Sequence, residues 1–308
     1  MLWRNCMNAS DKLIDQVIKK KNPCVVGLDP EWSKLPSCYQ NGKTKPESIL
    51  QWAKDIIDTI ADIVPAVKPQ MAFYEVYGAE GFRVFEEISA YAHEKDLLVI
   101  DDSKRNDIGN TARAYALAHL AKEGSINADF LTVSPFLGTD SLMPFAEIAK
   151  ENGKGVFILV KTSNPSSAEI SEAKREDGKS VRDFLAENVA KMGKDDIGEY
   201  GYSSIGAVVG ATFPEEARSL RKQMREAIFL VPGFGAQGGS AGDIVSCFNE
   251  DGLGAVVNSS RGIVYAYQNA ISFDGSRGAY LQTVRDATVL MRDAVYAALK
   301  ASYPNMRY

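Results

Sequence analysis

Eight short apolar runs that alternate with amphipathic stretches predict an α/β fold of the (β/α)8 class, the TIM barrel. The runs are apolar throughout, as expected of parallel strands that are covered on both faces. They lie at residues 24–29, 64–69, 97–102, 129–134, 155–161, 205–210, 227–233 and 254–260. A doubly wound open sheet is the competing architecture, but no GxGxxG sequence follows the first run.

The stretches between the runs repeat apolar residues at three- and four-residue spacing, which indicates helices with one buried face. These helices are expected at residues 46–63, 78–95, 111–124, 140–153, 180–193, 214–226 and 240–252. The sequence predicts one domain over residues 1–308, with a barrel core at about 22–272. A helix over 9–21, capped by Asn8 or Ser10, is expected to cover the lower end of the barrel, and a helix over about 281–302 to pack on it.

Two segments are longer than a minimal barrel requires. Residues 30–45 form an extended polar loop after the first strand, and residues 163–179 form a longer one after the fifth. Both follow the C-terminal ends of strands, where barrel enzymes carry their active sites, so either loop could be a lid. A solvated surface insertion explains each loop equally well.

Composition and charge narrow the function classes. The 308 residues are 45% hydrophobic, and the net charge of −5 is spread without a basic patch, which argues against a nucleic-acid or anionic membrane partner. Four scattered cysteines and two histidines in helix-like runs, His93 and His119, leave little material for a metal site, a disulfide framework or a Ser–His–Asp triad. Since neither a signal peptide nor an apolar stretch of about 18 residues is found, we expect a cytoplasmic protein without membrane spans.

Charged residues end three neighbouring strands. Asp29 ends the first run, Lys68 the second, and Asp102 with Lys104 the third. Asp102 and Lys104 are two residues apart, so in extended chain they point the same way. Any one of these residues alone would be explained by an exposed ion pair, but three charged strand ends together indicate a lysine–aspartate cluster. A lysine among carboxylates stays an ammonium, which makes it a poor Schiff-base nucleophile and a good proton donor.

Two stretches near the seventh and eighth strands have the character of phosphate sites. "VPGFGAQGGSAGD" (231–243) is a glycine-rich turn in which the backbone at Gly235 can approach an anion and Gln237 adds a donor. "VVNSSRGI" (256–263) places Arg261 just past the eighth strand, where a short helix can begin. Loops after strands seven and eight are the frequent phosphate position of this fold.

The stretch "KTSNPSS" (161–167) offers hydroxyls and an amide without charge after the fifth strand, which suits the polar edge of a heterocycle. An ordinary Asn-Pro turn explains it equally well. Tyr202 and Asn258 are further candidates for the wall of the pocket.

The charged motif resembles a known family. "DDSKRNDIGNT" resembles the D-x-K-x-x-D-I-x-x-T signature of orotidine 5′-phosphate decarboxylases, with Asp102, Lys104, Asp107, Ile108 and Thr111 at its fixed positions. "VVGLDP", "AVKPQMAFYE", "LTVSPFLGTDSL", "VKTSNPSS" and "VPGFGAQGG" resemble the longer bacterial, type 2 branch of that family. The resemblance runs in order from about residue 24 to 263.

The resemblance implies an activity in pyrimidine biosynthesis. Orotidine 5′-monophosphate would lose carbon dioxide to give uridine 5′-monophosphate, without a metal or an organic cofactor. Asp102 would lie against the substrate carboxylate, and Lys104 would protonate C6. Lys68 would belong to the charged tetrad, whose fourth member, Asp107, would reach into the site of the other subunit of a homodimer.

The resemblance also implies the contacts to the rest of the nucleotide. Asp29 and Lys68 would contact the ribose hydroxyls, and Thr111 would reach across the dimer interface with Asp107. Gln237, Gly235 and Arg261 would hold the phosphate. Ser163 is the candidate for the pyrimidine edge.

Three alternatives remain beside this assignment. Sister enzymes with the same barrel and D-x-K-x-x-D core depend on a metal and carry an acidic residue at the end of strand two, where this chain has Lys68; Glu75 lies several residues further on. A Schiff-base aldolase needs a lysine of lowered pKa, which flanking carboxylates oppose. A barrel that binds a nucleotide without catalysis would keep buried charges at a cost and without a use.

Overall fold

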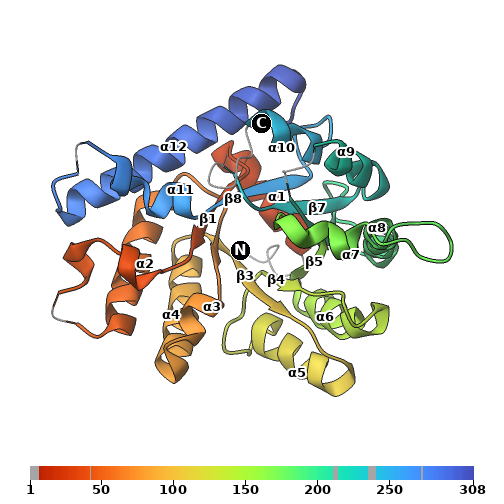
Figure 1. The fold of residues 1–308 in the computed structure, drawn as a ribbon, viewed down its shortest axis with the longest axis horizontal. Helices are drawn as coiled ribbons and strands as arrows, with labels where there is room; N and C mark the ends of the chain where they lie inside the picture. Colours follow the sequence, from red (N-terminus) through yellow and green to blue (C-terminus); the bar gives the residue numbers. More distant parts are fainter. Residues whose placement is uncertain (1–6, 42, 211–213, 235–240, 272) are drawn as a thin grey trace.

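Eight parallel strands close into a barrel in the computed structural model, in the chain order β1 to β8 (Figure 1). The structure describes residues 7–308 apart from 42, 211–213, 235–240 and 272. The strands are β1 (Cys24–Leu28), β2 (Ala66–Pro69), β3 (Leu98–Arg105), β4 (Phe130–Val133), β5 (Gly155–Lys161), β6 (Ser203–Val209), β7 (Ala227–Val231) and β8 (Ala255–Ser259). The predicted fold class is confirmed, and each expected run contains a strand.

Helices surround the barrel as an outer ring (Figure 1). The longer ones are α1 (Ala9–Lys20), α2 (Lys45–Ile60), α4 (Gly78–Glu94), α5 (Gly109–Leu120), α6 (Thr139–Asn152), α8 (Val181–Gly193), α9 (Pro214–Gln223) and α12 (Arg277–Ser302). The short ones are α3 (Ala72–Glu75), α7 (Ala168–Ser171), α10 (Ala241–Ile244) and α11 (Arg261–Val264). None of the helices in the described part of the chain is long and apolar enough to cross a membrane.

One expected helix is much shorter than the sequence pattern suggested. Instead of residues 240–252, the described chain has only α10 and a 3-10 turn over Val245–Cys247. After Cys247 the chain becomes extended at Phe248, with φ −93° and ψ 157°, and a turn in which the amide of Gly252 donates to the carbonyl of Asn249 then leads to β8. The extended backbone at Phe248 ends the helical run inside the expected range. The spacing of apolar residues did not reveal it.

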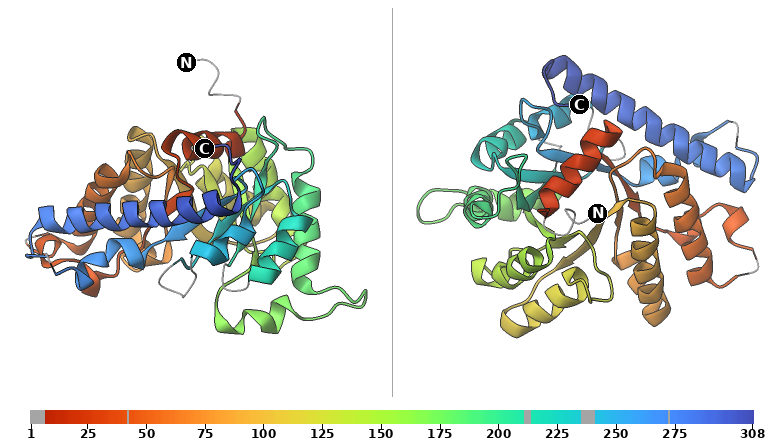
Figure 2. Two further views of the ribbon diagram at one scale, coloured as in Figure 1. Left: turned by 90° about the horizontal axis from the view of Figure 1, so that it is seen from above. Right: turned by 180° about the vertical axis from the view of Figure 1, so that it is seen from behind.

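The barrel interior is apolar and its lower end is covered by α1 (Figure 2). Leu13, Ile14 and Val17 of α1 pack against inward-facing residues of the strands, among them Phe130 and Phe157, whose rings stack 4.9 Å apart. Asn8 caps this helix, because its side chain accepts a hydrogen bond from the amide of Ser10 at 2.8 Å. The expected helix, its cap and its place under the barrel are therefore present.

Asp129, at the lower end of β4, predicts a loss of stability in acid. Burial raises the pKa of this carboxyl, but the contacts with His93, Lys154 and the amide of Val99 outweigh it and lower the pKa to about 2. Because the unfolded chain binds the proton first, this stabilisation is present above pH ~3.9 and is lost as the pH falls towards 2. The free energy of unfolding, measured in urea, should fall between pH 6 and pH 2.5 in both proteins. The fall should be about 1.5 kcal/mol smaller in Asp129→Asn than in the parent. Equal losses in both proteins would contradict this assignment.

The two extended loops differ in character. After β1, 3-10 turns at Trp32–Lys34 and Ser37–Tyr39 pack beside α2, and Tyr39 donates to the carboxylate of Asp55 at 2.6 Å. The loop after β5 contains a 3-10 turn at Pro165–Ser167 and α7, and it projects from the end of the barrel opposite to α1 (Figure 2). Only this second loop stands clear of the barrel at the end where the strands finish.

Candidate active site

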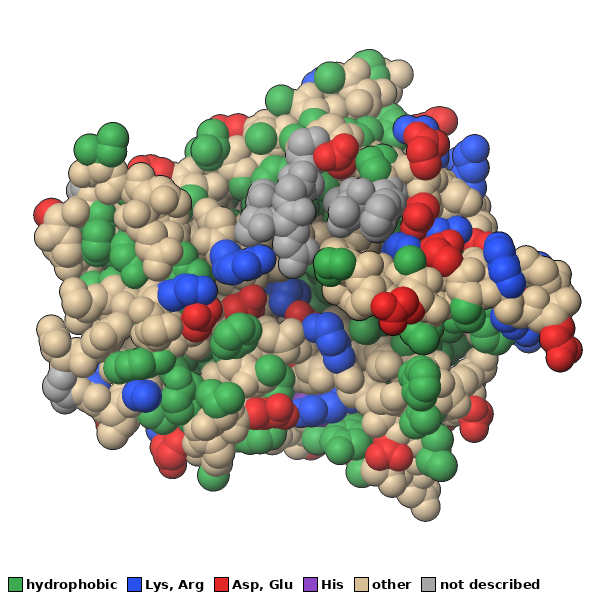
Figure 3. Space-filling view, viewed as in Figure 1, with side chains coloured by type: hydrophobic (Ala, Val, Ile, Leu, Met, Phe, Trp, Pro, Cys, Tyr) green, Lys and Arg blue, Asp and Glu red, His purple; other side chains and the backbone are tan. Residues whose placement is uncertain are grey.

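A cluster of opposite charges lies at the C-terminal end of the barrel. Asp102 stands between two ammonium groups: its Oδ2 lies 2.5 Å from Nζ of Lys68, and its Oδ1 lies 2.5 Å from Nζ of Lys104. The side chains of Lys68 and Asp102 are buried, whereas that of Lys104 is 44% exposed. Figure 3 shows acidic and basic side chains gathered in a hollow at the centre of this face. The three residues expected at neighbouring strand ends therefore meet, and Lys104 is the one that an entering molecule can reach.

The cluster keeps its central groups charged at neutral pH. Burial raises the pKa of Asp102, but the two lysines outweigh burial and hold the pKa well below its usual 3.8. Burial also lowers the pKa of Lys68, and the carboxylates of Asp102 and Asp29 reverse this, so its pKa lies above 10.5. A carboxylate and a buried ammonium are thus fixed side by side in a site of low dielectric constant.

The backbone of β3 is bent where Lys104 enters the site. Lys104 has φ +47°, and the register with β4 shifts between Asp101 and Arg105. A left-handed conformation costs a residue with a side chain roughly 1–2 kcal/mol, so contacts must hold it in place. The amide of Lys104 donates to Oγ1 of Thr132 at 2.9 Å, and the same hydroxyl donates to Asp102 at 3.1 Å. Thr132 of β4 therefore holds both charged residues in place.

A second network fixes the same strand from behind. His119 of α5 lies with Nδ1 2.5 Å from the carboxylate of Asp101, which is fully buried. Arg105 donates from Nε to Nε2 of His119 at 3.2 Å, which leaves the Nδ1 proton for Asp101, and it also pairs with Glu75 at 2.8 Å. These contacts anchor the bent end of β3. They also place Glu75 behind the strand, in a pair with Arg105.

A cavity of about 220 Å³ opens beside the cluster. Its walls include Asp29, Lys68, Asp102, Asn258 and Arg261, which come from the ends of β1, β2, β3 and β8. Arg261 begins α11, as the sequence predicted, and is exposed. The structure thus joins the charged cluster and one of the expected phosphate residues in a single hollow.

The remaining predicted residues lie elsewhere or are not described. Ser163 follows β5 and lies against Gly210 at the end of β6, where an added Cβ would come within 3.2 Å of the serine Cβ. Asp107 and Thr111 lie at the start of α5 and do not line this chain's cavity. Gln237 and Gly235 fall outside the described residues.

Sequence reasoning placed one residue wrongly and missed others. Tyr202 lies at the lower end of the barrel, where it packs with the α1 cluster and contacts Asn249, so it is not part of the pocket wall. Thr132 and His119 were missed as positioning residues. A lone hydroxyl in the apolar run of β4 was a signal for Thr132, whereas only the fold brings His119 to Asp101.

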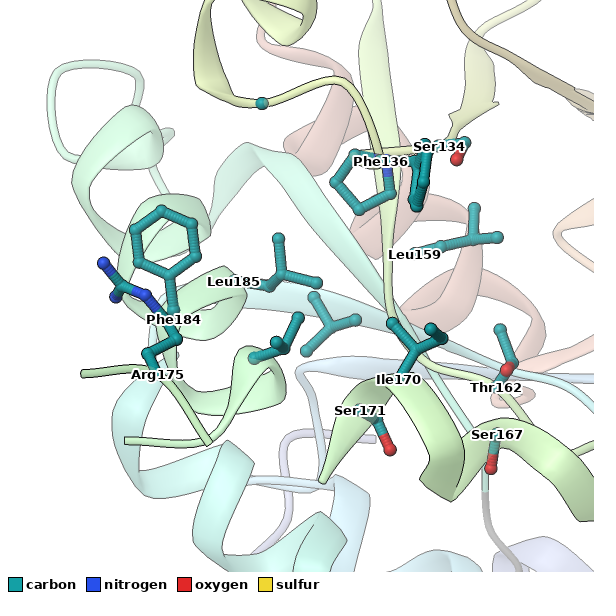
Figure 4. Close-up of a pocket in the computed structure, with 14 residues that line it drawn as sticks. Ser134, Phe136, Leu159, Thr162, Ser167, Ile170, Ser171, Arg175, Phe184 and Leu185 are labelled. Carbon is teal, nitrogen blue, oxygen red and sulfur yellow. The ribbon is translucent and has the colours of Figure 1, made fainter. Parts of the chain in front are cut away.

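A larger cavity lies beside the charged one. It measures about 490 Å³ and lies between the loop after β4, the end of β5 and α8, with α7 over it (Figure 4). Phe136, Ile170, Phe184 and Leu185 make its lining mostly apolar. The smaller cavity is the better candidate for an active site, because acid–base chemistry needs titratable groups held close together and the charged cluster lies there. Among the described residues, no group of three or more His, Cys, Asp or Glu is arranged to hold a metal ion.

A charged cluster at the C-terminal mouth of a (β/α)8 barrel is the arrangement of a barrel enzyme. Comparison with known proteins gives the family. Residues 22–271 match the model of the orotidine 5′-phosphate decarboxylase / HUMPS family, and the chain belongs to this family. The resemblance inferred from the motifs is therefore confirmed.

Two relatives that match this chain over nearly their whole length are both named orotidine 5′-phosphate decarboxylase. The orotidine 5′-phosphate decarboxylase of Rhodopirellula baltica is 41% identical over 298 residues, which cover 93% of this chain and 98% of the relative. That of Clostridium tetani is 40% identical over 292 residues, with 94% and 99% covered. The solved OMP decarboxylase of Leishmania donovani has a TM-score of 0.73 at 28% identity and covers 95% of this chain and 99% of its own.

Proposed function

We propose that this protein removes carbon dioxide from orotidine 5′-monophosphate to give uridine 5′-monophosphate, in the cytoplasm and without a metal or an organic cofactor. One observation carries the proposal: Asp102 is fixed between the ammonium groups of Lys68 and Lys104 at the edge of a cavity. Full-length relatives named for this reaction support it.

The chemistry needs a group that stabilises and then protonates a carbanion. Cleavage of the bond between C6 and the carboxylate leaves an electron pair on C6, and carbon dioxide departs. An ammonium fixed beside C6 stabilises that charge and delivers the proton, so Lys104 is the proton donor. Asp102 would face the substrate carboxylate, and Lys68 keeps Asp102 ionised and in place.

The rest of the nucleotide would be held by groups around the same hollow. Asp29 and Lys68 would bind the ribose hydroxyls, and Arg261 would bind the phosphate with Gln237 and the backbone at Gly235. Ser163, at the end of β5, would bind the pyrimidine edge. Binding of these remote groups supplies the energy that closes the site around the reacting carbon.

A homodimer would complete the site. Asp107 and Thr111 lie outside this chain's cavity, and exposed apolar side chains occur just before α5 and in the loop after β4. Ile108, Phe136 and Leu137 are 56%, 78% and 46% exposed. Figure 3 shows hydrophobic side chains on this part of the face. Exposed large apolar side chains are typical of an interface, so we infer that Asp107 and Thr111 serve the partner's cavity.

Absorbance loss of orotidine 5′-monophosphate with chelator-treated protein tests the proposed reaction. We expect full turnover after chelation and no gain on adding Mg²⁺. Turnover that depends on Mg²⁺ would move the protein to the metal-dependent sister enzymes. Binding of uridine monophosphate without turnover would leave a nucleotide-binding barrel.

Thr132→Val should slow the reaction without weakening substrate binding. The variant keeps the shape of the side chain but removes the hydroxyl that holds Lys104 and Asp102. Loss of these two hydrogen bonds predicts a fall in kcat of about 10- to 100-fold with KM within about twofold, because the ribose and phosphate contacts remain. Steady-state kinetics measure this, and an unchanged kcat would contradict the positioning role.

Mixing two inactive variants tests the shared site. Lys104→Ala and Asp107→Ala homodimers should each be nearly inactive, yet after subunit exchange each heterodimer has one site with both native residues. Equal amounts should then recover roughly one quarter of the parent activity per subunit. If Asp107 serves its own chain's cavity, every site in the mixture lacks one residue and no activity returns.

A further inference from the structure

Asn258 is a polar residue on the inner face of β8, at the floor of the charged cavity. Val256 packs in the barrel interior and Val257 packs outside it, so the alternation of the strand turns Asn258 inward. Only 6% of the residue is exposed, and it lines the cavity together with Asp29 and Lys68.

The side-chain oxygen of Asn258 has no hydrogen-bond partner among the described residues. Oδ1 is fully buried and unpaired, and Nδ2 makes only a long contact of 3.4 Å with Oγ of Ser260. An unpaired buried oxygen costs about 1–3 kcal/mol, so it points to a missing partner. Oδ1 of Asp29, in the same cavity, is also buried and unpaired among the described residues.

A glycine on the neighbouring strand lets the side chain of Ser260 lie close to this oxygen. An added Cβ on Gly27 of β1 would clash with the side chain of Ser260 and come within 3.3 Å of Oδ1 of Asn258. Gly27 is also the register partner of Lys68. Oδ1 of Asn258 therefore lies close to Asp29 and Lys68, which the proposed function assigns to the ribose.

We propose that Oδ1 of Asn258 accepts a hydrogen bond from a ribose hydroxyl of the bound nucleotide, next to the one that Asp29 accepts. Two unpaired acceptors require two donors, and a nucleoside monophosphate offers neighbouring donors in its two ribose hydroxyls, whereas its phosphate only accepts. Asn258 is then a residue that selects ribonucleotides over deoxyribonucleotides. This inference rests on the proposed function.

Calorimetric titration with three product-like nucleotides tests the contact. Uridine monophosphate, its 2′-deoxy form and its 3′-deoxy form would be titrated into the parent protein and into Asn258→Leu, which keeps the volume but lacks the acceptor. The parent should bind uridine monophosphate at least about tenfold more tightly than either deoxy form. Asn258→Leu should weaken uridine monophosphate binding by about tenfold and leave the affinity for one deoxy form unchanged, and Asn258→Asp should restore part of the discrimination.

The control is Asn249→Leu, because Asn249 bonds to Tyr202 at the opposite end of the barrel, and it should leave all three affinities unchanged. If Asn258→Leu does not fold, Asn258→Ala replaces it, since the ratio of the affinities for uridine monophosphate and for a deoxy form reports the same contact. Equal weakening of all three nucleotides, or no change in any, would overturn the inference. A parent protein that binds none of them would refute the proposed function, and this inference with it.

Discussion

Lys104→Ala is expected to lower kcat by at least about 10⁴-fold. The ammonium of Lys104 is the exposed member of the cluster, and the proposed reaction uses it twice, to stabilise the carbanion and to protonate it. Single-turnover and steady-state assays of orotidine 5′-monophosphate loss measure this effect. Binding of uridine monophosphate should weaken by less than about tenfold, since ribose and phosphate contacts remain.

Lys154→Ala is the matched control for this substitution. Lys154 is a buried lysine that pairs with Asp129 at 3.2 Å at the lower end of the barrel, so its substitution removes a paired lysine without touching the charged cavity. Its kcat should stay within about threefold of the parent. A Lys104→Ala variant that keeps more than about one hundredth of the parent kcat would contradict Lys104 as proton donor.

Asp102→Asn is expected to lower kcat by about 10²- to 10³-fold and to change the pH dependence. With a neutral amide in place of the carboxylate, Lys68 and Lys104 lose the charge that lies between them. Burial lowers the pKa of Lys68, and Asp102 is the main group that reverses this. The pKa of Lys68 should therefore fall in the variant, so its ammonium is lost at a lower pH than in the parent.

A profile of kcat/KM between pH 6 and pH 10 measures this effect. The parent should show no loss from Lys68 below its raised pKa, whereas the variant should lose activity as the pH rises above neutral. Asp129→Asn removes a buried carboxylate that is also paired with a lysine, but far from the cavity, and should keep the parent profile. Parallel profiles for Asp102→Asn and the parent would argue that Lys68 does not depend on Asp102.

The sequence predicted the fold because the strands are short, continuous apolar runs with turn signals between them. Each expected run contains a strand, and a helix lies in each expected stretch, because runs of four to eight apolar residues between turn residues are too short for buried helices. The helix expected at 240–252 is wrong beyond Cys247, because the backbone becomes extended at Phe248 and the spacing of apolar residues does not reveal such a break. β3 also runs further than expected, to Arg105, since its charged end pairs with β4.

Part of the site could be predicted because strand ends converge in a barrel. That rule alone brings Asp29, Lys68 and Asp102 together, and the structure places them in one cavity. Contacts that depend on side-chain geometry could not be predicted in this way. Thr132 is recognised only through the bent backbone at Lys104, and the bond between His119 and Asp101 only through the packing of α5 behind β3.

The helix beneath the barrel decides where the products of the reaction leave. In the described part of the chain, α1 packs across the lower end of the barrel and the stacked rings of Phe130 and Phe157 lie in its interior, so the charged cluster opens at the other end. In the proposed reaction, carbon dioxide formed beside Asp102 would therefore leave on the same side as the nucleotide. Product and the next substrate would also pass the open end of the barrel, where Arg261 and the loop after β5 lie.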